Sequence, residues 1–575
     1  MLHIKKIFGI ILGLTLFISV PSFAQDLKSA IKLTESEQFE AAHKVFDALI
    51  AKEPGKPDNY YYYGECWLKQ YFVDSMSVSL KEVTEPALAQ YKKGIEKDTN
   101  FPLNYVGVGR VDVLLGKNAE AKKMFAKAKD KLPFKNYTNP KYIPVAKQAL
   151  TYAKIAQAEL MATDRNKDEM LELITKAVDR DPSVVDVYLI KGDIYLEYND
   201  GSNAIVAYLK ANELDSLSCK AMVKIGEVYV RGHTYEDALK YFKKAIEIDS
   251  FFAPAYRERA ELYGLADRWE KAVKDYKKFV ELSGNNTYAK YRLASFLFMA
   301  KRYDECLQVC SEVLAIDPSY VILYRLEGYS YFETGKYPEG LKAIETFFKE
   351  AKPEKIINSD YIYYGDLLSK TGSDAQGLEK YNIALKNDTS NCELLSKIIK
   401  SYQKLKDFDS AIKTFQKKAN NNCLTLNDNY EMAKIYLNNG GVLWTKKDTA
   451  GAFKAWNKAD TLFGTVLAKK PDFYNAINYR AKLNINMDTA YKLGTAVKWY
   501  NVLLPYALKD TAKYSKDVYT AYDYIRFYTY KQYIRSKNCD DAKKCIENCD
   551  KILALYPKDD KALETKRGLK IKCPY

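Results

Sequence analysis

Small residues recur at a fixed spacing of 34 along this chain of 575 residues. The series consists of Gly192, Gly226, Ala260, Ala294 and Gly328. Three further series keep the same period, namely Tyr195, Tyr229, Tyr263, Leu297 and Tyr331; Ala204, Ala238, Ala272, Cys306 and Gly340; and Tyr208, Phe242, Tyr276, Cys310 and Ile344. A period of this length is typical of one helix–turn–helix unit stacked on copies of itself. The spacing therefore predicts an all-α solenoid of antiparallel helix pairs.

Residues 219–252 show how one such unit is expected to pack. Gly226 and Tyr229 lie on its first helix, and Ala238 and Phe242 lie on its second. The small residues let the two helices approach closely, the aromatic rings fill the remaining space, and neighbouring units bury the outer apolar faces. This pattern resembles the tetratricopeptide repeat (TPR). The resemblance implies a right-handed superhelix whose concave groove binds a peptide or a partner's helix.

The resemblance covers nearly the whole chain after residue 24, with about thirteen repeats. Its regularity changes along the chain, because insertions near 70–86 and 134–150 break the register. We therefore expect three stretches: 25–184 with TPR-like repeats and insertions, 185–419 with a regular array, and 420–575 with degenerate repeats and a capping helix near 558–571.

The first 24 residues have the features of a secretory signal peptide. Lys5 and Lys6 precede an apolar run at 7–20, and Ala24 offers a small residue before Gln25. The run is too short to span a membrane convincingly, and no later segment is long and apolar enough to do so. We expect cleavage after Ala24 and a periplasmic protein of a bacterium.

The net charge of +15 falls to +13 when Lys5 and Lys6 are removed with the signal peptide. The lysines are scattered over expected exposed helix positions, which favours an ordinary solvated surface. An exported chain rarely meets nucleic acid, so no nucleic-acid partner is expected. The alternative is attraction toward anionic envelope lipids, polysaccharide or an acidic partner.

No arrangement of residues indicates an active site. His43 and His233 are the two histidines after residue 24, and the motifs HExxH, GxxxxGK[ST] and GxSxG are absent from the sequence. There is also no CxxC. We therefore expect no catalytic residue, no cofactor and no metal site, and a protein that is not an enzyme.

The cysteines near the C-terminus predict a covalent restraint. If the chain folds back at Pro557, Cys539 and Cys573 lie about equally far from the turn and face each other. We expect this pair to form a disulfide that holds the capping helix, with Cys545 as the next candidate. Cys392 with Cys423 is a weaker pair, because adjacent helix starts are often too far apart for a bond.

The resemblance places groove-facing side chains at positions 2, 5, 9, 12 and 13 of each unit. In 185–218 these are Asp186, Leu189, Asp193, Leu196 and Glu197, and in 219–252 they are Lys220, Val223, Glu227, Val230 and Arg231. The next two registered units considered, 287–320 and 321–354, give an aromatic set with one arginine at its centre. From it we predict a partner-binding patch of Tyr288, Tyr291, Phe298, Met299, Arg325, Tyr329 and Phe332. The alternative is that another helix of the chain covers these residues.

Taken with the export signal, the resemblance implies a non-catalytic interaction scaffold of the bacterial cell envelope. It would hold a peptide or a partner subunit in its groove, within an outer-membrane assembly, secretion or motility complex, to which it would attach peripherally. The Lys and Asn pair with which some TPR proteins grip a C-terminal carboxylate is absent from positions 5 and 9 of the registered units. The alternative function is that of a glycan- or peptidoglycan-associated binding protein.

Overall fold

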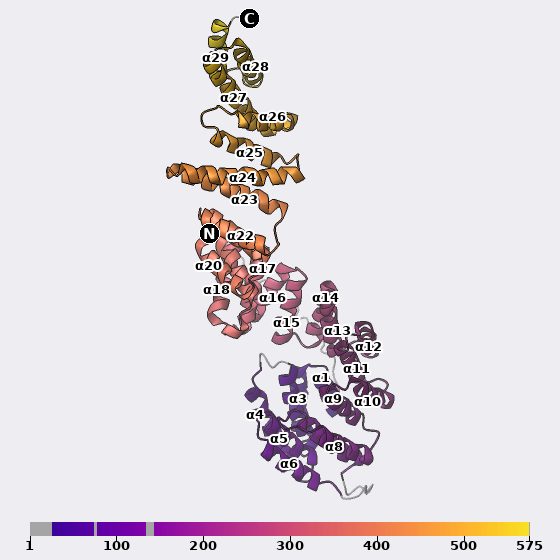
Figure 1. Cartoon of the computed structure of the whole chain (residues 1–575). Coiled ribbons are helices and arrows are strands. Elements are labelled where there is room, and N and C mark those ends of the chain that lie inside the picture. Colours follow the sequence, from indigo (N-terminus) through magenta and orange to yellow (C-terminus); the bar gives the residue numbers. More distant parts are fainter. Residues whose placement is uncertain (1–25, 74–77, 134–142, 574–575) are drawn as a thin grey trace, which may run out of the picture. The chain divides into compact units, whose positions relative to one another are not determined.

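The computed structural model describes residues 26–73, 78–133 and 143–573, and the expected signal peptide lies outside them. All regular elements in these ranges are helices, which confirms the all-α solenoid (Figure 1). The contacts divide the chain into a first unit that ends at Gly335 and a second unit that begins at Lys336. The three stretches 25–184, 185–419 and 420–575 were defined by the regularity of the repeats, whereas these two units are defined by contacts. The three stretches therefore stay a prediction.

In the first unit, consecutive helices form eight antiparallel pairs, α1 with α2 through α15 with α16, followed by α17. Their bounds are α1 Leu27–Glu35, α2 Phe39–Lys52, α3 Pro57–Val73, α4 Leu80–Lys97, α5 Pro102–Leu114, α6 Asn118–Asp130, α7 Val145–Glu159, α8 Lys167–Arg180, α9 Val185–Glu197, α10 Gly201–Leu214, α11 Cys219–Arg231, α12 Tyr235–Ile248, α13 Ala253–Leu265, α14 Trp269–Leu282, α15 Thr287–Met299, α16 Tyr303–Ile316 and α17 Val321–Glu333.

The second unit begins with α18 and continues with five pairs, α19 with α20 through α27 with α28, before α29 ends it. Its bounds are α18 Tyr337–Glu350, η1 Pro353–Lys355, α19 Asn358–Lys370, α20 Asp374–Asn387, α21 Cys392–Lys404, α22 Phe408–Asn420, α23 Leu426–Thr445, α24 Thr449–Lys469, α25 Tyr474–Met487, α26 Thr495–Ala507, η2 Leu508–Asp510, α27 Thr511–Ser536, α28 Cys539–Leu555 and α29 Asp560–Lys572.

The period of 34 in the sequence is the period of the helices. The first helices α9, α11, α13, α15 and α17 begin 34 residues apart, at Val185, Cys219, Ala253, Thr287 and Val321. The turn that follows each of these five helices repeats as well, with one residue per turn in the left-handed region. These residues and their φ angles are Asn199 at 59°, His233 at 57°, Asp267 at 54°, Lys301 at 59° and Gly335 at 78°. Only the last is a glycine, so residue type alone does not mark this turn position.

The small residues of the first series are required by close contact with an aromatic ring. A Cβ placed on Gly192 would overlap the ring of Tyr208, and one on Gly226 would overlap the ring of Phe242. Tyr208 and Phe242 lie on α10 and α12, the second helices of the same pairs. The second unit repeats the arrangement with Gly365 against Tyr381 and Gly440 against Trp456. This contact explains why the glycine and the aromatic series keep the same period.

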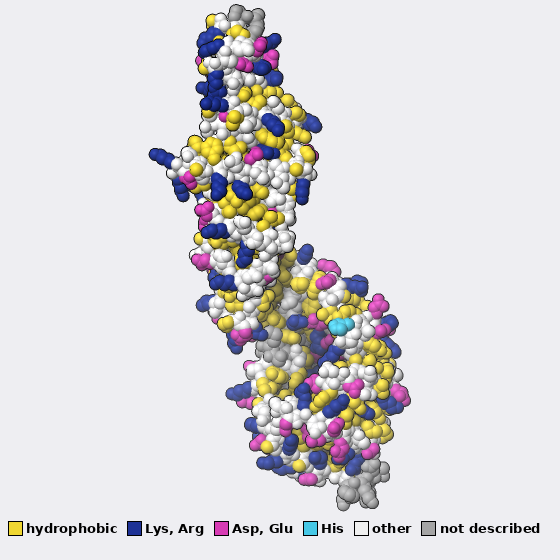
Figure 2. All heavy atoms as spheres, in the orientation of Figure 1, with side chains coloured by type: hydrophobic (Ala, Val, Ile, Leu, Met, Phe, Trp, Pro, Cys, Tyr) yellow, Lys and Arg dark blue, Asp and Glu magenta, His cyan; other side chains and the backbone are white. Residues whose placement is uncertain are grey.

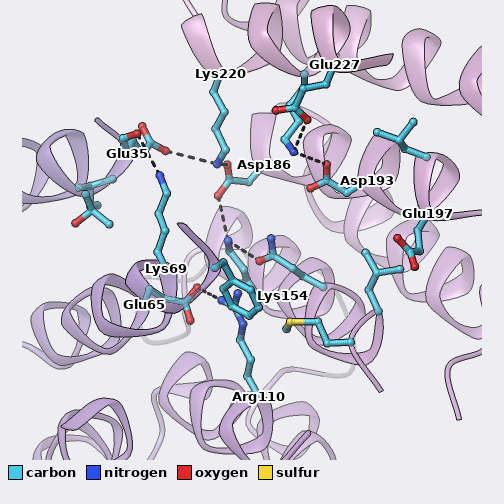
Figure 3. A pocket seen from close by; sticks show the side chains of 18 of the residues that line it. Glu35, Glu65, Lys69, Arg110, Lys154, Asp186, Asp193, Glu197, Lys220 and Glu227 are labelled. Carbon is cyan, nitrogen blue, oxygen red and sulfur yellow. Dashed lines mark hydrogen bonds and ion pairs between the residues drawn. The ribbon is translucent and has the colours of Figure 1, made fainter. Parts of the chain in front are cut away.

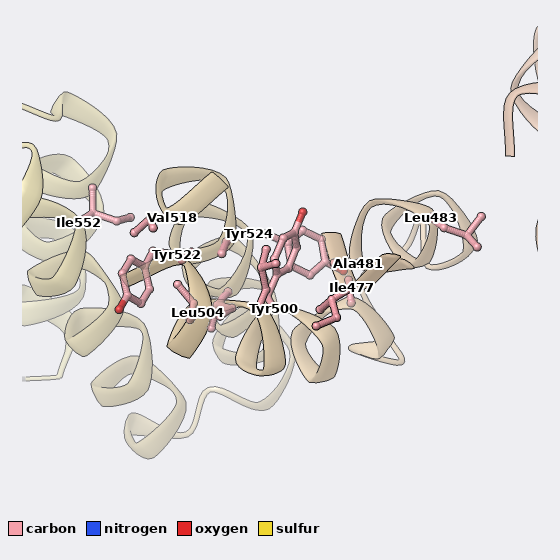
Figure 4. Close-up of a cluster of buried hydrophobic side chains, with 14 of the residues drawn as sticks. Ile477, Ala481, Leu483, Tyr500, Leu504, Val518, Tyr522, Tyr524 and Ile552 are labelled. Carbon is pink, nitrogen blue, oxygen red and sulfur yellow. The ribbon is translucent and has the colours of Figure 1, made fainter. Parts of the chain in front are cut away.

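The C-terminal half of the second unit shares one continuous apolar core. Tyr500 and Ile477 are fully buried there, and Ile552 extends the same core to α28 (Figure 4). Cys539, at the start of α28, forms a disulfide with Cys573 at the end of α29, with 5.7 Å between their Cα atoms. The capping helix is thus covalently held against its neighbour.

A second disulfide joins Cys392, at the start of α21, to Cys423, just before α23. Their Cα atoms are 6.0 Å apart, a separation that a disulfide readily spans. Adjacent helix starts are therefore close enough here, against the sequence-based argument that ranked this pair as the weaker one. Cys545, the alternative partner for Cys573, is a buried free thiol.

Candidate functional site

A hollow of about 670 Å³ lies inside the first unit. The first helix of each of the first six pairs contributes to its lining, so it lies on the concave face of the solenoid. Its charged lining residues are Glu35, Glu65, Lys69, Arg110, Lys154, Asp186, Asp193, Glu197, Lys220, Lys224, Glu227 and Arg231. Six of these are basic and six are acidic. We call this space the hollow.

Asp186 lies between cations from two neighbouring helices of the hollow (Figure 3). Its carboxylate is 3.6 Å from Nζ of Lys154 and 3.7 Å from Nζ of Lys220. Burial alone would raise the pKa of Asp186, but Lys220 and Lys154 outweigh it and hold that pKa at about 2. Lys220 also lies 3.5 Å from Glu35, so this chain of charges connects α7, α9, α11 and α1.

A second pair lies deeper on the wall formed by α3 and α5. Arg110 donates to Glu65 at 2.6 Å, and the two side chains are 12% and 15% exposed. The hydroxyl of Tyr91 also donates to Glu65, at 2.8 Å. Burial raises the pKa of Glu65, yet the charge of Arg110 gives a net lowering. Glu65 is therefore ionised at neutral pH. Its contacts with Arg110 and Tyr91 hold the side chains of this wall in place.

Lys69 and Arg231, unlike the other cations of the hollow, donate to backbone oxygens and have no ion pair among the described residues. The ammonium of Lys69 donates to the backbone oxygen of Glu35 at 3.1 Å, and no carboxylate among the described residues lies within ion-pair distance of it. Burial lowers the pKa of Lys69 to about 8, although the attraction of Glu37 opposes this. Lys69 is thus a partly shielded cation with capacity for an added anionic group (Figure 3).

The wall formed by α1 is held by ion pairs to helices far along the chain. Glu37, which is 3% exposed, accepts at both carboxylate oxygens from Arg257 of α13, each at 2.6 Å. Lys32 of α1 lies 2.9 Å from Asp249. Glu37 and Arg257 are 220 residues apart in sequence. These contacts hold α1, which contributes to the lining of the hollow, to α13 and to the end of α12.

The groove-facing residues predicted from the sequence lie on the same face of the solenoid as the hollow. Seven of the ten groove-facing residues expected in 185–218 and 219–252 line the hollow: Asp186, Asp193, Leu196, Glu197, Lys220, Glu227 and Arg231. Sequence analysis missed the contributions of α1, α3, α5 and α7, such as Lys69 and Arg110, because insertions obscure the register of the first pairs. The charged residues at groove positions, such as Asp186 and Lys220, are the sequence signal that indicates this site.

The predicted aromatic patch lies on α15 and α17, as its register implied, but much of it is packed. Tyr291 and Tyr329 are each 6% exposed. The ring of Tyr291 lies 5.1 Å from that of Tyr320, and the ring of Phe298 lies 5.7 Å from that of Tyr329. These two tyrosines therefore offer little of their surface to a partner.

The remaining members of that patch keep some access to solvent. Tyr288, Phe298, Arg325 and Phe332 are partly buried, and Met299 is 46% exposed. Partner binding by this set stays a prediction.

Lysine and arginine side chains are spread over the whole face of the molecule that Figure 2 shows, as the sequence indicated. Within the residues that the structure describes, no helix combines the length and the apolar character that crossing a membrane requires.

Comparison with known families identifies the repeat. The model of the C-terminal ARM domain of tetratricopeptide repeat protein 21 matches residues 210–325. A TPR repeat-containing protein of Methanocaldococcus jannaschii is 28% identical over an alignment of 184 residues that covers 29% of this chain. The chain spans about a third of the length of that relative, since the match covers 31% of it.

Three solved structures of helical-repeat proteins are also similar. The C-terminal part of a TPR repeat-containing protein from Cytophaga hutchinsonii is 28% identical and covers 48% of this chain and 98% of its own, with a TM-score of 0.39. YrrB, described as a TPR protein with an unusual peptide-binding site, is 22% identical and covers 32% and 93%, with a TM-score of 0.29. Yeast Tom70 is 16% identical and covers 68% and 90%, with a TM-score of 0.28.

Proposed function

Because this chain is a tetratricopeptide-repeat protein, we propose that it is a non-catalytic scaffold that binds a segment of a partner protein in the hollow of its first unit. The observation that carries the proposal is the lining of this space by six successive first helices. Stacked repeats form extended concave surfaces of this kind, which suit a chain segment better than a compact small molecule.

The charges of the hollow suggest how a partner segment would be held. Most of its cations and anions compensate each other, so the lining has little net charge of its own. A segment with both acidic and basic side chains could exchange these internal pairs for external ones. Lys69 would accept a carboxylate without giving up an existing ion pair, and it is the residue we expect to contribute most to selectivity.

Site-specific photo-crosslinking tests this assignment. A photoreactive amino acid at Gln157 or Arg231, both in the lining, should form adducts with the same partner protein in living cells. The matched control is Lys243, an exposed residue of the second helix α12. Lys69→Glu should abolish the adducts while the helical circular dichroism remains. Equal adducts at Lys243, or none at either lining position, would contradict the proposal.

We further propose that the protein works in the bacterial envelope, within an outer-membrane assembly, secretion or motility complex. The signal-like residues 1–24 and the two disulfides support this location, since disulfides persist in oxidising compartments. N-terminal sequencing of the protein from a periplasmic extract should begin at Gln25. Recovery with the cytoplasmic fraction and an intact residue 1 would refute it, and retention on purified peptidoglycan would favour the glycan-binding alternative.

A further inference from the structure

The two disulfides leave six of the ten cysteines free, and four of these form two pairs with one arrangement. Cys306 and Cys310 lie one turn apart on α16 of the first unit, and Cys545 and Cys549 lie one turn apart on α28 of the second unit. All four side chains are fully buried. The sequence contains no CxxC, yet a spacing of four residues on a helix also brings two side chains together. We call each pair a dithiol.

The two dithiols occupy the same positions of the repeat. Three other units carry alanine at the position of Cys306 and an aromatic ring at the position of Cys310. A buried Val313 follows three residues after Cys310, and a buried Ile552 stands at the same spacing on α28, so the registers match. Free cysteine packs as a small apolar side chain, which explains one buried thiol. Packing alone does not explain why two thiols replace alanine and the ring together.

The thiols of the first dithiol converge. Their Sγ atoms are 3.9 Å apart, and Sγ of Cys306 lies 3.3 Å from the backbone oxygen of Ala294. The hydroxyl of Ser330, fully buried on α17 beside Cys306, has no hydrogen-bond partner among the described residues. In the second dithiol, Sγ of Cys545 likewise lies 3.3 Å from a backbone oxygen, that of Arg526. Each dithiol thus offers sulfur ligands in a space closed to solvent.

Two sulfur ligands restrict the kind of metal ion that fits. A metal bound to thiolates at about 2.3 Å can bridge sulfurs up to about 4.6 Å apart, and the observed separation of 3.9 Å lies within that limit. Among the described residues, no third histidine, cysteine or carboxylate completes a larger ligand set. Structural Zn²⁺ takes four ligands. Cu(I) is soft, prefers thiolates and is satisfied by two of them, so it is the ion that suits a dithiol.

We propose that each dithiol binds one Cu(I) ion, as a function separate from the binding of a partner in the hollow. Both thiols release their protons to solvent, both sulfurs bond to copper, and no electron is transferred. The product is a Cu(I) bis-thiolate with a single negative charge. The positive charge of Arg526 lies near Cys545 and favours this product. The carboxyl of Glu327 lies near Cys306 and opposes it, so the dithiol of α28 should bind copper more tightly.

Titration with Cu(I) tests the proposal. The chain from residue 25 onward is titrated in ascorbate without oxygen, in competition with the chromogenic chelator bicinchoninate, until the absorbance is constant. The chain should withdraw two copper ions from the chelator, and native mass spectrometry should show both on the folded chain. Because copper at these sites binds the folded chain, Tm should rise with the concentration of free copper. No withdrawal of copper by the unaltered chain would reject the proposal.

Substitutions locate the two ions. Cys306→Ala and Cys545→Ala each remove one sulfur, and other repeats carry alanine at this position, so the fold should be retained. Each variant should lose one copper ion, seen as at least a tenfold loss of affinity at that site, and the double variant should lose both. Cys219→Ala is the matched control. It removes a buried free thiol whose Sγ contacts backbone oxygens and no other cysteine of the described residues, and it should keep both ions.

Two results would overturn this assignment. Full copper binding by the double variant, with native circular dichroism, would mean adventitious binding at the surface. An equal loss for Cys219→Ala would mean that copper does not require a pair of thiols. Failure of either kind would leave the function proposed for the hollow intact, because none of the four cysteines lines that space.

Discussion

The two units secure their outermost described helix by different means. In the first unit α1 and its turn are held by ion pairs, chiefly Glu37 with Arg257. In the second unit α29 is held by the Cys539–Cys573 disulfide. The first restraint depends on charge and desolvation, and the second depends on the redox state. One repeat architecture therefore carries two ends that should respond to different changes in the surroundings.

The largest effect is expected from removing one partner of the buried ion pair. Arg257→Met leaves the Glu37 carboxylate buried without its cation, so the free energy of unfolding should fall by about 3–5 kcal/mol. Hydrogen exchange measured by mass spectrometry should show that α1 loses protection. Glu37→Gln combined with Arg257→Met should recover part of the loss. Arg165→Met, at the exposed pair with Glu197, is the control and should cost less than about 1 kcal/mol.

The matching change in the second unit is the removal of its C-terminal disulfide. Cys539→Ser with Cys573→Ser opens a loop with a sequence separation of 34, and the chain-entropy model gives a loss of about 3–4 kcal/mol. Hydrogen exchange measured by mass spectrometry should increase in α28 and α29 but not in α1. A reducing agent should reproduce the increase in α28 and α29 in the unaltered protein, with a further increase near α21 because it also opens the Cys392–Cys423 disulfide. If reduction exposed α1 as strongly as α29, the contrast between the units would be wrong.

A smaller effect concerns the pH dependence of the first unit. The pKa of Lys69 is lowered from 10.5 to about 8 in the folded chain, so the unfolded chain binds more protons between these values. The free energy contributed by this group therefore rises with pH from about 8 to about 10.5. Thermal unfolding of Lys69→Met should lack this contribution, so its Tm should rise less, or fall more, than that of the unaltered chain. Lys404→Met in the second unit is the control and should follow the unaltered chain.

The smallest effect should be the same in both units. Lys301 of the first and Lys447 of the second have φ angles of 59° and 65°, a region that is costly for residues other than glycine. Replacing either with glycine should raise the free energy of unfolding by about 0.5–1 kcal/mol, because relief of strain exceeds the added chain entropy. Denaturant titration measures this gain. Gly335→Ala should shift the midpoint in the opposite direction.

Local spacing made much of the fold predictable. Gly192 and Tyr208 reveal a helix pair because each determines how close the other's helix can come, and the starts at Val185 and Cys219 follow from that register. The contact between Glu37 and Arg257 could not be read in this way, since it depends on the curvature accumulated over several pairs. The burial of Tyr291 could not be predicted from local spacing either. Tyr291 occupies a groove position in the register, yet its ring packs against that of Tyr320, the residue that precedes α17.

The tie between Glu37 and Arg257 also has a consequence for the order in which the chain is completed. A solenoid folds largely through contacts between neighbours, which can form as soon as each pair is available. Glu37 is an exception, because its partner lies 220 residues later, in the seventh pair. At ordinary rates of synthesis that interval lasts roughly 10–45 s. Among the described helices α1 is the first in the sequence, yet the turn that follows it is among the last parts of the first unit to reach its final contacts.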